Sequence, residues 1–195
     1  MIRSRPSIAL AAFLLVGAFL PGACTAAPPV SFDPAAPCSI DARLPGAYPA
    51  LEALVPARLF GAPPDRLDSG RNCSTTNLGT LAGHGVTEVH FAGGLWERSK
   101  TSGVTLAVFA GDGLTAEWMG EWYEASARLS SKTAGLRPTR PIIAGRQGYR
   151  LDLLASEAPQ TVICWPSADG RTVDVVIGAG VPESDIAAAV AAFGA

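Results

Sequence analysis

Short β-rich segments separated by single helices are the feature that most constrains the fold of this chain. Residues 86–91 and 104–110 form two such segments, and the longest helical pattern follows them, beginning at Ala116. Four more β-rich segments and an Ala-rich helix that opens at Pro182 come next; the segments are 142–144, 149–154, 161–165 and 172–177. Asp169-Gly170 predicts a tight hairpin between the last two. This order favours an α+β fold, in which helices cover one face of an antiparallel sheet.

The helix expected from Ala116 to about Ser131 concentrates large side chains within two turns. They are Trp118, Met119, Trp122 and Tyr123. A single helical face carries Trp118, Trp122, Ala125 and Leu129. We therefore interpret the two tryptophans as core residues, with Met119 and Tyr123 at the margin. The alternative is that these four large side chains line a binding surface for a protein partner or an apolar ligand.

The N-terminal residues have the pattern of a secretory signal peptide. Arg3 and Arg5 precede an apolar run, residues 8–20, that contains no charged side chain. A membrane-spanning helix needs about 20 apolar residues, so this run is too short to cross a bilayer comfortably. The pattern therefore predicts export.

The segment Leu20-Pro21-Gly22-Ala23-Cys24 resembles the lipobox of bacterial lipoproteins, although Pro21 stands where an aliphatic residue is usual. The resemblance implies a signal peptide over residues 1–23 and a lipid on Cys24 that anchors the protein to the cell membrane, facing outward. The alternative is cleavage after Ala27, which would release a soluble secreted protein. Residues 24–37 are rich in Pro and Ala and predict a disordered tether that reaches roughly 40 Å.

Residues 38–195 are enough for one α+β domain. Its three cysteines, in an oxidising compartment, allow one disulfide and one free thiol. We pair Cys38 with Cys73 because both lie outside the predicted strands, and the bridge would close a segment read as loop over residues 56–72. Cys164 lies inside a predicted strand, where a free cysteine usually packs as a small hydrophobe. Pairing of Cys73 with Cys164 remains open.

Composition and motifs exclude several classes of function. The formal net charge of −2 gives no basic surface for nucleic acid. The sequence contains neither a G-x-S-x-G elbow nor a complete nucleotide-binding fingerprint, and His84, Glu88 and His90 lack the usual spacing of zinc ligands. We therefore expect no cofactor and no metal site. The basic residues between Glu124 and Asp152 are interpreted as a solvated surface, with a patch for anionic lipid as the alternative.

One catalytic arrangement is compatible with the residue types in the sequence. Cys164 as nucleophile, His90 as base and Glu88 as orienting group would make a thiol-dependent enzyme. The simpler interpretation is a hydrogen bond between Glu88 and His90 on a partly exposed strand, with Cys164 as packing.

In the order of its elements, the body is similar to the small α+β domains of exported bacterial lipoproteins, including those with a PsbP-like sheet. The resemblance implies the architecture alone, since one fold hosts many functions. The sequence thus predicts a lipid-anchored cell-envelope protein that binds a protein partner or an apolar ligand without catalysis.

Overall fold

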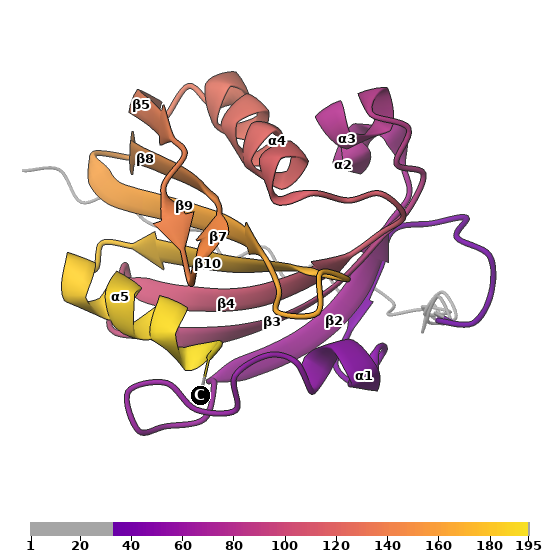
Figure 1. The fold of residues 1–195 in the computed structure, drawn as a ribbon, viewed down its shortest axis with the longest axis horizontal. Coiled ribbons are helices and arrows are strands. Elements are labelled where there is room, and N and C mark those ends of the chain that lie inside the picture. The colour runs from indigo at the N-terminus through magenta and orange to yellow at the C-terminus, as the bar shows by residue number, and fades with distance from the viewer. Residues whose placement is uncertain (1–32, 195) are drawn as a thin grey trace, which may run out of the picture. The chain divides into compact units, whose positions relative to one another are not determined.

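An eight-stranded antiparallel sheet forms the centre of the computed structural model, which describes residues 33–194 (Figure 1). In spatial order its strands are β1 (Ala42–Leu44), β2 (Arg66–Asn72), β3 (Val89–Glu97), β4 (Gly103–Ala110), β10 (Val173–Ala179), β9 (Ala158–Pro166), β8 (Tyr149–Ala155) and β5 (Thr133–Thr139). A separate two-stranded ribbon consists of β6 (Ile142–Ile143) and β7 (Arg146–Gln147). Every neighbouring pair in the large sheet is antiparallel, so the predicted α+β class is confirmed.

Two runs of strands build the sheet. Strands β1 to β4 follow one another, and helix α4 (Ala116–Leu129) then takes the chain to the far edge. From β5 the chain returns through β8 and β9 to β10, which pairs with β4 in the middle of the sheet. The two runs therefore share one continuous set of hydrogen bonds.

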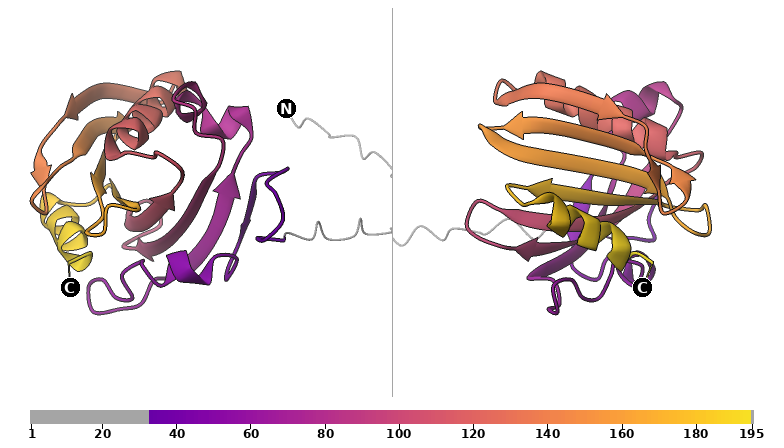
Figure 2. Two further views of the ribbon diagram at one scale, coloured as in Figure 1. Left: turned by 45° about the vertical axis from the view of Figure 1, so that its right-hand side comes forward. Right: turned by 60° about the vertical axis from the view of Figure 1, so that its left-hand side comes forward.

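Helices pack on both faces of the sheet, whereas the sequence predicted one covered face. Helices α2 (Thr75–Leu78), α3 (Thr80–Gly83) and α4 lie on one side, called the α4 face here. Helices α1 (Pro49–Glu52) and α5 (Glu183–Ala192) lie on the other, the α5 face (Figure 2). The central strands explain this difference. In β4, Leu106 and Val108 are buried on the α5 face while Ala107 and Phe109 are buried on the α4 face. Strands that are apolar on both sides require cover on both sides.

Two glycines let the long helices approach the sheet. A Cβ atom on Gly120 of α4 would lie 2.0 Å from Cγ of Tyr149, so the tyrosine ring fills the space that a side chain would need. On the opposite face, a Cβ on Gly178 of β10 would lie 1.9 Å from Cδ1 of Ile186 in α5. Absence of a side chain at these positions sets how closely each helix packs.

The predicted disulfide between Cys38 and Cys73 is present, with a Cα–Cα distance of 6.1 Å. Cys164 is a buried free thiol, so the rival pairing with Cys73 is wrong. Closing a loop of 35 residues stabilises the folded state by about 4 kcal/mol in the chain-entropy model. A disulfide of this kind is compatible with an exported protein.

The segment that this disulfide closes is not the loop that the sequence predicted. It contains β1 and β2, and β2 pairs with β3 along its whole length. The prediction missed β2 because its sequence, RLDSGRN, is polar. In the structure Ser69 and Arg71 of this strand are nevertheless buried beneath the N-terminal segment.

Residues 33–37 of the predicted tether are described, and they contact the domain. Arg71 donates a hydrogen bond from Nη1 to the carbonyl oxygen of Ala36 at 2.6 Å, and Asp33 accepts one from the backbone nitrogen of Ala35 at 2.9 Å. The signal peptide, Cys24 and the rest of the tether lie outside the described residues. In the part of the chain from 33 to 194, no helix has the length and apolar character needed to cross a membrane.

Local signals in the sequence locate two elements correctly. The hairpin between β9 and β10 turns at Asp169-Gly170, with Gly170 at a φ of 68°. Helix α4 begins after Thr115, whose hydroxyl accepts a hydrogen bond from the backbone nitrogen of Trp118 at 3.2 Å. Both signals act over a few residues and do not depend on distant parts of the chain.

Candidate functional site

The buried face of α4 differs from the face that the sequence predicted. Met119 and Gly120 are buried against the sheet, and Tyr123 packs on the same core, where burial raises the pKa of its hydroxyl. Trp118 and Trp122 lie half-buried beside this core. The assignment of the two tryptophans to the core and of Met119 to its margin was therefore wrong. The apolar side chains of α4 form two adjacent stripes, one with Met119 and Tyr123 and the other with Trp118 and Trp122. Gly120 has no side chain and packs on Tyr149 of the sheet, so the stripe beside Gly120 is the one that reaches the sheet.

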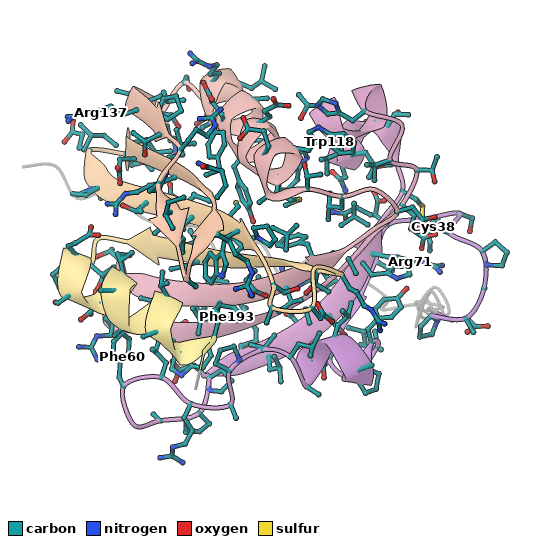
Figure 3. All side chains as sticks on the ribbon, viewed as in Figure 1. Cys38, Phe60, Arg71, Trp118, Arg137 and Phe193 are labelled. Atoms are coloured by element: carbon teal, nitrogen blue, oxygen red, sulfur yellow. A yellow bond between two sulfur atoms is a disulfide. The ribbon has the colours of Figure 1, made fainter. Side chains whose placement is uncertain are left out.

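Both tryptophans are held firmly at the surface of α4. The ring of His84 stacks on Trp118 with centroids 4.5 Å apart, while its Nε2 lies 2.8 Å from a carboxylate oxygen of Glu121. Trp122 donates from Nε1 to the carbonyl oxygen of Asn77 at 3.0 Å. Figure 3 labels Trp118 beside α3. These contacts connect α4 to the α2–α3 segment and present parts of both indole rings to solvent.

An open groove lies between α4 and the α2–α3 segment. We call it the α4 groove; its volume is about 320 Å³, and its lining consists of Thr76, Asn77, Gly79, Thr80, Trp122, Ala125, Ser126 and Leu129. Leu129 at the end of α4 is 90% exposed. An exposed leucine beside a half-buried indole gives this groove an apolar part in an otherwise polar lining, so it can accept an apolar group.

The Glu88–His90 pair lies at the other candidate position. Glu88 Oε1 and His90 Nε2 are 2.7 Å apart, and the ring of Tyr48 stacks on His90 with centroids 4.5 Å apart. A cavity of about 390 Å³ borders both residues and also Asp112 and Arg171. The hydrogen bond expected from the sequence is therefore present.

Cys164 does not lie near this pair. Its side chain is 0% exposed within the core of the α4 face, and burial raises the pKa of its thiol. Val89 of β3 belongs to that core. His90 is the next residue along the strand, so its side chain points to the opposite face, the α5 face. Three strand spacings separate β9 from β3, which is roughly 14 Å. The structure thus does not bring together the nucleophile and base of the thiol-enzyme hypothesis.

A buried carboxylate that the sequence analysis missed lies on the α5 face. Asp174 of β10 stands opposite Val108 and Trp165 and is 8% exposed. Burial and the nearby charge of Asp169 raise its pKa to about 6, while Arg146 acts weakly in the opposite direction. The sequence does carry a signal for it, because Asp174 is a charged residue inside the apolar run Val173-Asp174-Val175-Val176.

Three of the six basic residues between Glu124 and Asp152 pair with acidic side chains. Arg140 donates from Nε to Glu117 at 2.8 Å and lies over the ring of Tyr149. Arg150 donates to Asp152 and to Glu183 of α5. Arg128 pairs with Glu124 one turn earlier on α4. Among the described residues, Lys132, Arg137 and Arg146 form no ion pair, so both the solvated surface and the patch for anionic lipid stay open predictions.

Comparison of the chain with protein-family models, with curated proteins and with solved structures found no match. The described residues contain no group of three His, Cys, Asp or Glu side chains placed to hold a metal ion.

Proposed function

We propose that this protein is an exported cell-envelope protein, anchored by a lipid on Cys24, that binds an apolar group of a partner or ligand without catalysis. The lipobox-like segment before Cys24 supports the anchor. The Cys38–Cys73 disulfide, directly after the Pro/Ala-rich segment, is compatible with an oxidising compartment. A tether of this kind would hold the domain away from the bilayer and leave its surfaces accessible.

The α4 groove carries the binding part of this proposal. Leu129 is 90% exposed, and Trp122 is kept partly accessible by its hydrogen bond to Asn77. Burying an exposed leucine side chain in a contact gains about 2 kcal/mol, so covering this groove would be favourable. The separation of Cys164 from His90 weakens the alternative of a thiol-dependent enzyme.

The anchor is tested by the intact mass of the protein from detergent-solubilised host membranes. We expect a chain that begins at Cys24 and carries a diacylglyceryl group, and we expect Cys24→Ala to lose both this mass and membrane retention. A soluble chain beginning after Ala27 would contradict the anchor and would indicate that Pro21 prevents recognition of the lipobox.

The groove is tested separately with anilinonaphthalene sulfonate, an anionic dye whose aromatic rings bind exposed apolar surface with a rise in fluorescence. Leu129→Glu should reduce binding of the probe, because it places a charge at the mouth of the groove. Leu44→Glu is the matched control, since Leu44 is also an exposed leucine but lies on the edge strand β1. Equal loss in both variants, or loss in neither, would contradict binding at the α4 groove.

A further inference from the structure

The carboxyl group of Asp174 has no partner that accounts for its burial. Among the residues from 33 to 194, none donates a hydrogen bond to it and none forms an ion pair with it, and Arg146 acts on it only through space. At 8% exposure, the residue is nevertheless the second residue of the interior strand β10, beside the β9–β10 turn. An ionised carboxylate in such a place is costly unless an opposite charge or hydrogen-bond donors meet it. The position therefore points to a ligand that supplies them.

A cavity borders this carboxyl group. We call it the Asp174 cavity; its volume is about 190 Å³, and its lining consists of Leu54, Ser167, Ala168, Asp169, Thr172, Asp174 and Phe193. These residues come from three places: the turn after α1, the β9–β10 hairpin and the end of α5. Figure 3 labels Phe193 at the end of α5, on the side of the sheet opposite Trp118. The lining thus combines apolar side chains with two hydroxyl groups and two carboxyl groups.

The charges in the lining of the cavity favour a cation, and Arg146 is a positive charge outside the lining that acts on Asp174 through space. Its lining contains two carboxylates and no lysine or arginine. One oxygen of Asp169 already stabilises the hairpin, because it accepts hydrogen bonds from Ser167 and from the backbone nitrogen of Arg171. The carboxylate of Asp174 accepts no hydrogen bond of this kind from the described residues. Its carboxylate is the group available to a ligand.

The apolar walls distinguish an organic cation from a metal ion. Calcium and magnesium require six or more oxygen ligands, several of them usually carboxylate or carbonyl oxygens. The ring of Phe193 instead packs edge-on against Trp165, with centroids 5.3 Å apart, and Leu54 also lines the cavity. An aromatic ring and an aliphatic side chain contact the carbon body of an amine, and the ring also attracts its charge.

We propose that the Asp174 cavity binds a compact organic cation of the alkylammonium type, with Asp174 as its counter-ion and with Phe193 and Leu54 in contact with its alkyl chain. The cavity lies on the α5 face, away from the α4 groove, so the proposal does not rest on the proposed function. A volume of about 190 Å³ suits a small amine or the end of one basic side chain.

The experiment measures binding of n-butylammonium to the complete mature chain at pH 7.5 by nuclear magnetic resonance. We expect saturable shifts of backbone amide signals in residues 167–174, and we expect Asp174→Asn to weaken binding by about tenfold or more. Asp112→Asn is the control, because it removes one negative charge from an exposed turn outside this cavity. Its affinity should equal that of the unmodified protein.

Three results would overturn the proposal. The first is equal affinity of butylammonium for Asp174→Asn and for the unmodified protein. The second is equal binding of the uncharged analogue n-butanol, which would show that the charge plays no part. The third is Asp174-dependent binding of calcium without any binding of butylammonium, which would identify a metal site instead.

Discussion

Replacement of Asp174 by asparagine should stabilise the protein at neutral pH and change its stability little near pH 4. Asparagine has nearly the same size and shape, so it preserves packing against Val108 and Trp165. It removes only the ionisation of a buried side chain that no described residue pairs with. The predicted effect therefore isolates the cost of burying this charge.

The size of the effect follows from the pKa of Asp174. Burial raises it from 3.8 to about 6, and a difference of roughly two units corresponds to at most about 3 kcal/mol, which solvent near the carboxyl group reduces. A raised pKa means that the folded state holds this proton at pH values where the unfolded state has released it. The contribution of Asp174 to stability is therefore complete below about pH 4 and is lost as the pH rises through 6. The asparagine variant does not undergo this loss.

The assay is urea unfolding, with the disulfide intact, at several pH values from about 4 to 7.5. The difference in free energy of unfolding between variant and unmodified protein should be close to zero at the acidic end. It should rise to as much as about 3 kcal/mol in favour of asparagine at the neutral end. Asp169 and Arg146, the charged groups that act on Asp174, are present in both proteins. Their own titration therefore cancels, to a first approximation, in the difference in free energy of unfolding. A difference that is independent of pH, or an asparagine variant that is less stable at pH 7.5, would refute this reasoning.

Three further predictions concern packing. Gly120→Ala should destabilise the protein by about 1–3 kcal/mol, because the new Cβ would meet the ring of Tyr149. The assay is thermal unfolding, and the control is Gly83→Ala, because a Cβ at Gly83 would have no atom within 4 Å. Equal effects of the two would contradict the close approach of α4. Reduction of the disulfide should lower the free energy of unfolding by about 4 kcal/mol in urea, and an unchanged midpoint would disprove its role. Cys164 should react with iodoacetamide only after unfolding, and rapid labelling of the folded protein would contradict its burial.

Several elements could be predicted from the sequence because short-range rules govern them. The Asp169-Gly170 hairpin, the N-terminal cap at Thr115 and the apolar strand β4 each depend on a few neighbouring residues. Strand β2 could not be predicted in this way. Its polar side chains are buried by contacts with α1 and the N-terminal segment, as when Ser69 donates to Glu52 at 2.8 Å. Contacts between distant segments override local propensity there.

For the candidate sites, the sequence determined which side chains exist and roughly which element carries each. It placed a thiol and a histidine on strands, and a cluster of large side chains on α4. Only the tertiary structure decided that Cys164 and His90 point to opposite faces, because strand order and register set the face of every residue. The same holds for Asp174. Its carboxyl group lacks a partner among the described residues because neither the two neighbouring strands nor the helices on the α5 face place a donor or a cation beside it. That arrangement is fixed only when these distant segments pack together.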